Sequence, residues 1–192
     1  TGCLKIAKES IFTGTNNFVS ETILSSRLSE CFGFVQCEVN QILADAGIEG
    51  KAEMMKKWYD GYHFGSVDVY CPWDVMCYVQ KLMTDSNAQP DNFWKNTSDN
   101  AVIRSFIDYA GASITKKFET LMDGGYIVQK VDENLTYDYL HSSEENLWSM
   151  LYLTGYLTRL RDDEIGEALP EDTVALKIPN RETVSYTHLR AH

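Results

Sequence analysis

The chain has 192 residues, enough for one sizeable hydrophobic core or two small ones, and its 44% hydrophobic content is typical of a globular protein rather than a disordered one. The formal net charge of -11 argues against a chain that binds nucleic acid over much of its surface, because phosphate binding relies on clustered Lys and Arg. Its cysteines include no Cys-x-x-Cys pair, so neither a disulfide framework nor a zinc site is indicated. No run approaches the length of a membrane span and no leader is recognisable, so we expect a cytoplasmic protein with no membrane partner.

Two helices are predicted before the middle of the chain, and residues 18–24 upstream of them fit a short strand. The first helix is ended by Gly47 and has an apolar stripe at i, i+3, i+4 and i+7, formed by Val39, Ile42, Leu43 and Ala46. The second is expected from about residue 51 to residue 60, with Gly61 at its end. Three of its side chains are expected to be buried: Met54, Met55 and Trp58.

A dense aromatic span then runs from Trp58 to Trp73. It predicts a hairpin that turns at Gly65-Ser66, followed by a helix that begins at Pro72, where a missing N–H costs nothing. We expect the aromatic side chains, Trp73 among them, to form a rigid core brace between helices rather than a platform for a ligand. The helix after Pro72 should bury one apolar side, made of Val75, Met76, Val79, Leu82 and Met83.

The second half of the chain predicts three more helices and three short strands. One helix follows Ser98 as its N-cap, one ends at Gly124-Gly125, and one begins with a capping box of Ser142 and Glu145. The strands are expected at residues 126–131, 156–160 and 174–178, the last two on either side of an acidic loop. The predicted fold class is therefore α+β, mainly helical.

Few side chains are spaced for chemistry. The chain lacks the Gly-x-x-x-x-Gly-Lys-Ser/Thr loop that would hold nucleotide phosphates. Asp45 with Glu49-Gly50-Lys51 superficially matches the acid, acid-x-lysine pattern of a metal-dependent nuclease, but the spacing is too short and favours a solvated turn between helices. His63 is expected to be a packed or hydrogen-bonded hairpin residue in preference to a catalytic base.

Three basic residues near the start, Lys5, Lys8 and Arg27, flank an apolar segment and a polar loop from which they could reach an anion. Their spacing alone favours an ordinary solvated face.

A series of blocks along residues 1–182 resembles one protein family. The blocks are Thr1 to Asn17, Cys31-Phe32-Gly33-Phe34, Trp58 to Gly65, Tyr70 to Trp73, Phe93 to Ser98, Asn146 to Ser149, Gly155 to Thr158 and Leu176 to Asn180. Together they resemble the bacterial AAA-ATPase-like family, whose full-length members often end in a restriction-endonuclease-like nuclease domain of the DUF1703 type. One departure is Val35, which stands where family members usually carry a Thr or Ser N-cap.

The resemblance implies that this chain is the later part of an ATPase module, downstream of a P-loop half that would be its partner. Residues 1–30 would be the end of the P-loop ATPase core, with Thr1 as the sensor and with Lys5, Lys8 and Arg27 as contacts to nucleotide phosphate. Residues 31–182 would form a helical lid region with the aromatic hairpin. ATP and Mg²⁺ would be bound by the intact protein and not by this fragment alone. The resemblance stops before residues 183–192, which are predicted to be a non-native tail.

Three functional hypotheses follow. The first is a sensor and helical-lid fragment that couples ATP binding or hydrolysis to conformational change and is inactive by itself. The second is an interaction module of winged-helix type that recognises a partner protein or a nucleic acid, although the net charge restricts any nucleic-acid surface to a local patch. The third is a free-standing metal nuclease that depends on Glu49.

Overall fold

The computed structural model describes residues 21–93, 111–133, 135, 143–166 and 168–188. The chain is α+β, with small antiparallel sheets, and forms two compact units. Unit 1 takes in the residues up to Leu24 and those from Asn100 to Lys177, whereas unit 2 takes in Ser25 to Asp99 and the residues from Ile178 onward. This division differs from the predicted boundary at residue 30, and the assignment of residues 1–30 to a nucleotide core stays a prediction.

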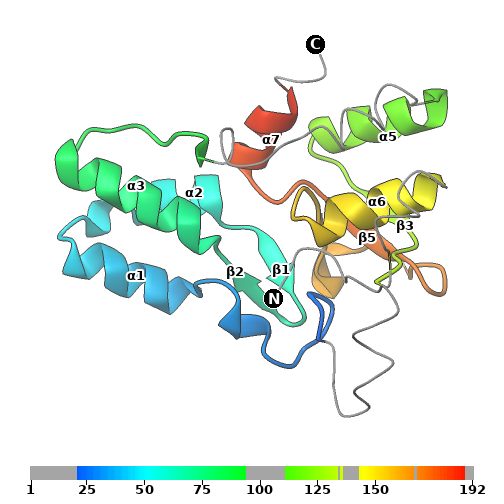
Figure 1. Ribbon diagram of the computed structural model, residues 1–192, viewed down its shortest axis with the longest axis horizontal. Helices are drawn as coiled ribbons and strands as arrows, with labels where there is room; N and C mark the ends of the chain where they lie inside the picture. The colour runs from blue at the N-terminus through cyan, green and yellow to red at the C-terminus, as the bar shows by residue number, and fades with distance from the viewer. Residues whose placement is uncertain (1–20, 94–110, 134, 136–142, 167, 189–192) are drawn as a thin grey trace, which may run out of the picture. The chain divides into compact units, whose positions relative to one another are not determined.

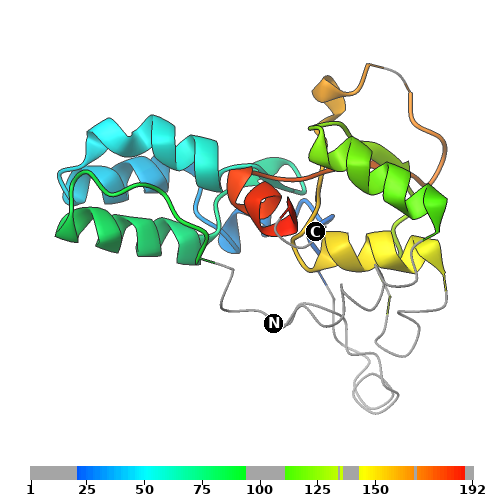
Figure 2. The same ribbon diagram turned by 90° about the horizontal axis from the view of Figure 1, so that it is seen from above.

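Unit 2 is built from helices around a two-stranded hairpin. Its elements are α1 (Gln36–Asp45), α2 (Ala52–Tyr59), β1 (Tyr62–Phe64), β2 (Val67–Val69), α3 (Pro72–Thr84) and α7 (Arg181–His188), with short 3-10 turns at Ser29–Cys31 and Glu49–Lys51. Helices α1, α2 and α3 lie side by side in both views (Figures 1 and 2), and α7 packs on α2.

Helix α1 confirms the predicted stripe and its end. Val39 and Leu43 are buried, and Gly47 has the left-handed backbone (φ 68°) that stops a helix. At the other end Val35 offers no side-chain cap, but its own N–H donates to Oε2 of Glu38 at 3.0 Å. Glu38 thus supplies half of a capping box, which partly compensates for the missing Thr or Ser.

Helix α2 is confirmed, but its buried face is turned from the predicted one. Met55 and Tyr59 are fully buried, whereas Met54 is 38% exposed and Trp58 is only partly covered. Residues four apart share one face of a helix, so burying Met55 selects Tyr59 and turns Met54 toward solvent.

The predicted face of α3 is wrong for Met76 and Met83, which are 48% and 70% exposed. The buried face instead consists of Val75, Tyr78, Val79 and Leu82, together with the carboxylate of Asp74. Trp73, expected in a core brace, is 55% exposed at the first turn. Helix α3 has more apolar residues than one buried face can hold. Tyr78 is buried on that face, whereas Met76, which the pattern predicts to be buried, is exposed.

The hairpin of unit 2 turns at Gly65, which has a positive φ of 55°, and its register pairs Tyr62 with Val69. Tyr62 and Tyr70 are both buried, and the Tyr70 hydroxyl donates to Oε1 of Gln36 at 2.7 Å. Tyr70, which directly follows β2, belongs to the helical core of the unit. This core contains Val39, Leu43, Met55, Tyr59, Tyr70, Val75, Tyr78, Val79, Leu82 and Ala88.

Unit 1 combines two helices with a three-stranded antiparallel sheet. Its described elements are α5 (Ala112–Met122), β3 (Ile127–Gln129), α6 (Glu144–Leu153), β4 (Thr158–Arg159), the 3-10 turn η5 (Asp162–Glu164) and β5 (Val174–Lys177). The strand order is β3-β5-β4, so β5, the last of the described strands, lies in the centre. Leu176 of β5 pairs with Ile127 on one side and with Arg159 on the other.

These elements confirm the predicted strands at 126–131, 156–160 and 174–178 and the helix that ends at Gly124-Gly125. The predicted strand at 18–24 is wrong for residues 21–24, which form no strand and end in a turn at residues 23–24, and residues 18–20 lie outside the described residues. The helix expected after Ser98 also lies outside them.

Helix α6 is the buried centre of unit 1. Six consecutive side chains, from Leu147 to Tyr152, are buried, and the ring of Trp148 lies 5.1 Å from that of Phe118. The N-cap is Ser143, whose hydroxyl accepts the N–H of Asn146 at 3.2 Å, so the predicted cap at Ser142 is displaced by one residue. Two adjacent serines carry the same chemical signal, and packing of the following helix selects between them.

None of the described helices is both long enough and apolar enough to cross a membrane.

Candidate functional site

Three of the four predicted site residues, Thr1, Lys5 and Lys8, lie outside the described residues. Arg27 is described and exposed, and it precedes Leu28, whose φ of 61° is left-handed. The grouping of Arg27 with the other three residues around a phosphate stays a prediction.

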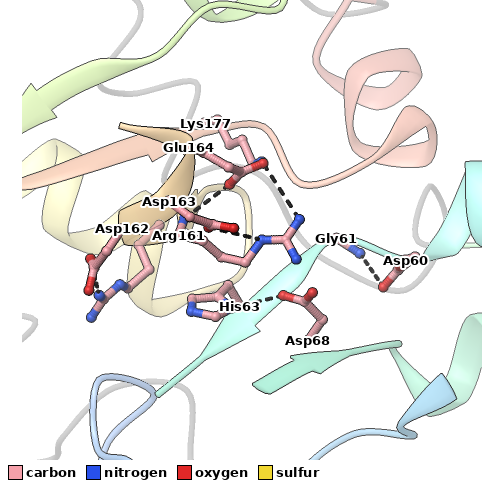
Figure 3. A network of polar contacts seen from close by, with 10 residues as sticks. Asp60, Gly61, His63, Asp68, Arg161, Asp162, Asp163, Glu164 and Lys177 are labelled. Atoms are coloured by element: carbon pink, nitrogen blue, oxygen red, sulfur yellow. Dashed lines mark hydrogen bonds and ion pairs between the residues drawn. The ribbon is translucent and has the colours of Figure 1, made fainter. Parts of the chain in front are cut away.

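The strongest concentration of buried polar groups in unit 2 lies where α7 meets the hairpin. Gly61, with a φ of 122°, packs so closely on the main chain of Pro179 that a Cβ built on it would fall 2.0 Å from the Pro179 carbonyl oxygen. The N–H of Gly61 donates to Oδ1 of Asp60 at 2.8 Å (Figure 3). Only glycine fits this backbone and this approach.

Hydrogen bonds fix the first turn of α7 at the same place. Asn180 acts as its N-cap, because its Oδ1 accepts both the N–H and the hydroxyl of Thr183 at 3.0 Å. Nδ2 of Asn92 also donates to the carbonyl of Glu182 at 3.3 Å. Helix α7 runs without a break from Arg181 to His188, across the predicted start of the non-native tail at Thr183, and Thr183 is buried. The non-native origin of residues 183–192 stays a prediction.

Two carboxylates are buried at this junction. Asp74 is 0% and Glu182 2% exposed, and each lies in the first turn of a helix, where the helix dipole favours a negative charge. Burial is the main cause that raises the pKa of Tyr62, and the nearby carboxylates of Asp74 and Glu182 raise it further.

His63 and Asp68 face each other across the hairpin, with Nδ1 of His63 2.8 Å from Oδ1 of Asp68 (Figure 3). His63 is 8% exposed. This confirms the prediction that His63 is a packed, hydrogen-bonded hairpin residue. Sequence spacing could not reveal the partner, because it depends on the cross-strand register.

The acidic pattern at Asp45 and Glu49 lies on the connection between α1 and α2, as predicted, and both side chains are exposed. Within the described ranges, no group of three or more His, Cys, Asp and Glu side chains is placed to hold a metal ion.

Unit 1 carries a cluster of ion pairs on β4, η5 and β5, which we name the β4-β5 cluster (Figure 3). It consists of Arg159, Arg161, Asp162, Asp163, Glu164 and Lys177. The acidic loop is visible in the sequence but the cluster is not, since strand pairing is needed to bring Lys177 beside the loop.

The geometry of the β4-β5 cluster is tightest at Glu164. Nζ of Lys177 lies 2.8 Å and 3.0 Å from its two carboxylate oxygens, and the N–H of Arg161 donates to Oε2 at 3.0 Å. Burial tends to raise the pKa of Glu164, but the bonds from Lys177 and Arg161 outweigh it and the net shift is downward. Arg159 reaches Asp162 at 3.1 Å.

Comparison with known proteins gives one partial likeness. Over 81 residues the chain is 30% identical to a protein from Azotobacter chroococcum mcd 1 described as an uncharacterized protein in the vnfD 5' region. The matched segment is 42% of this chain and 16% of that protein. No family model and no solved structure matches the chain.

Proposed function

We propose that unit 1 is a protein-interaction module of the winged-helix type. The observation that supports this proposal is the order of its elements: a helix, an edge strand, a second helix and then two strands, of which the last inserts between the other two as β3-β5-β4. In a winged helix the loop between the last two strands projects as the wing. Here the corresponding loop joins β4 to β5.

The charges of this loop favour a protein partner over a nucleic acid. Asp162, Asp163, Glu171 and Asp172 are all exposed on it. The basic side chains beside them are already paired with carboxylates in the β4-β5 cluster. Helix α6, which would otherwise offer a face to a DNA groove, is buried from Leu147 to Tyr152. The partner's surface is therefore expected to be basic.

A labelled Lys/Arg-rich peptide tests this proposal. We expect binding that weakens with salt and is lost when Asp162, Asp163, Glu171 and Asp172 are changed to their amides. A charge-matched comparison sets the double variant Asp162→Asn, Asp163→Asn beside Glu119→Gln, Asp123→Asn, which changes exposed carboxylates of α5 and its C-cap. Equal binding by the two variants would show that net charge alone attracts the peptide and would refute the proposed site.

A second proposal concerns unit 2, as the helical lid of an AAA-ATPase-like protein. Its support is that blocks carrying the family resemblance, far apart in sequence, pack together: Gly61 lies on Pro179, and Asn92 bonds to Glu182 next to the last block. A unit braced in this way can move as a body when nucleotide state changes. ATP and Mg²⁺ would be bound mainly by a P-loop half, with Thr1 as sensor and Lys5, Lys8 and Arg27 near the phosphates.

Calorimetric titration with Mg-ATP tests the second proposal. This chain alone is expected to bind weakly or not at all, and a version extended upstream to include a P-loop is expected to bind. In the extended protein, Arg27→Ala should weaken binding, whereas Lys57→Ala, at an exposed position of α2, should not. Tight Mg-ATP binding by the chain alone would refute the proposal that a P-loop half binds the nucleotide and this chain supplies the lid.

A further inference from the structure

Three cations of unit 1 lie on two paired strands and the residues that follow β4. Arg159 is in β4, Arg161 comes two residues later, and Lys177 is in β5, where it pairs in register with Thr158 next to Arg159. Their side chains are 23%, 48% and 30% exposed. Paired antiparallel strands thus hold Arg159 and Lys177 in one place, and Arg161 lies beside them at the start of η5.

The carboxylates that neutralise these cations come from a single turn, and two of them are more exposed than the cations. Asp162 and Asp163 are 90% and 81% exposed, far more than Arg159, to which Asp162 bonds. All three carboxylates belong to η5, three consecutive residues in a loop. The turn therefore covers the cations with negative groups at the positions where an incoming anion would approach.

Most of the ion pairs that hold η5 beside the cations are weak. Exposed ion pairs typically contribute between about 0 and 1 kcal/mol, and the Arg161 pairs, at 4.0 Å and 3.7 Å, are long. Glu164 is the best anchored of the three, because it bonds to Lys177 and to the Arg161 N–H, whereas Asp162 has one bond, to Arg159 at 3.1 Å. A phosphate offers several acceptor oxygens to an arginine and can replace a carboxylate there.

We propose that Arg159, Arg161 and Lys177 form a binding site for the phosphate backbone of a nucleic acid, and that the acidic turn η5 occupies this site as an autoinhibitory contact. The site binds DNA when the turn is displaced or neutralised. It adds a second ligand class to unit 1 and does not depend on the basic protein partner proposed above.

The test is DNA binding by a triple amide variant: Asp162→Asn, Asp163→Asn and Glu164→Gln. Amides keep the size of the side chains and a carbonyl acceptor for the Arg161 N–H, but remove the negative charge. A labelled DNA duplex is titrated by fluorescence anisotropy at low and moderate salt. Wild type is expected to bind only weakly, and the triple variant is expected to bind at least about tenfold more tightly, with an affinity that falls as the salt concentration rises.

A matched control separates this site from a change in net charge. Glu119→Gln, Asp123→Asn and Glu171→Gln remove the same number of charges from exposed positions of unit 1 outside the β4-β5 cluster. This variant is expected to bind DNA no better than wild type. Equal gains in the two triple variants, or no gain in the amide variant of η5, would overturn the proposal.

Two further variants test the site, one with a smaller change that is less able to disturb folding and one that removes the cations. Asp162→Asn alone changes a side chain that is 90% exposed, and it should produce a smaller gain of about two- to threefold. Adding Arg159→Gln and Lys177→Gln to the triple amide variant should return binding to the wild-type level. Persistence of DNA binding without those two cations would place the contact elsewhere and refute the site.

Discussion

Gly61 lies against the carbonyl group of Pro179, so that the hairpin entry and the segment before α7 meet main chain to main chain. Gly61→Ala should therefore be severely destabilising, because the added Cβ would fall 2.0 Å from the carbonyl oxygen and the φ of 122° disfavours any other residue. We expect a loss of about 3 kcal/mol or more in the free energy of unfolding, measured by urea denaturation with circular dichroism.

Gly47→Ala is the control for backbone strain, since Gly47 has a φ of +68° but no heavy atom within 4 Å of a built Cβ. It should cost about 1–2 kcal/mol. If Gly61→Ala costs no more than this control, the close approach to Pro179 does not stabilise unit 2.

The N-cap of α7 should be measurable in the same way. Asn180→Ala removes the acceptor for the N–H and the hydroxyl of Thr183 and should lower the free energy of unfolding by about 1 kcal/mol. Asn180→Asp keeps an acceptor oxygen and should restore most of the loss. Equal destabilisation by the two substitutions would show that the amide acts through another contact.

Local signals in the sequence were sufficient for the elements whose ends they mark. Gly47 ends α1 and Gly124-Gly125 follows α5, because a positive φ or a missing side chain stops a helix whatever surrounds it. The two strands around the acidic loop were likewise predictable, since strand pattern and turn residues alternate there.

The junction in unit 2 and the β4-β5 cluster could not be predicted, because both depend on partners distant in sequence. Nothing local indicates that Asn92 bonds to Glu182, or that Lys177 pairs with Glu164. The buried state of Asp74 was missed for a related reason: its position in the first turn after Pro72 suggests a solvated carboxylate at a helix start.

The ion pair between Lys117 and Glu144 in unit 1 should make stability depend on pH. The hydrogen bond from Lys117, 2.6 Å from Oε1, is the main cause that lowers the pKa of Glu144. Since the folded pKa lies below the unfolded one, the contribution is present above the ordinary carboxyl pKa and is lost as pH falls through the folded value. Both side chains are about a third exposed, so we expect only about 0.5–1 kcal/mol.

Lys117→Met should therefore be less stable than wild type at pH 7, and the difference should shrink as pH falls below the ordinary Glu pKa of about 4.3. Lys116→Met, at the exposed neighbouring position, should match wild type throughout. A difference that is constant across this pH range would indicate lost packing on Trp148, whose ring centroid lies 5.9 Å from Lys117 Nζ, and not the ion pair.

The sequence pattern and the structure disagree about which face of α3 is buried, and two substitutions can test this. The sequence pattern places Val79 and Met83 on the same buried side, whereas the structure leaves Val79 5% and Met83 70% exposed. Val79→Ala should thus cost about 1–3 kcal/mol through the cavity it leaves, and Met83→Ala less than about 0.5 kcal/mol. Thermal denaturation of the two variants beside wild type measures both. Comparable losses would mean that α3 is rotated about its axis toward the face that the sequence pattern predicts, because a methionine that points to solvent has no packing to lose.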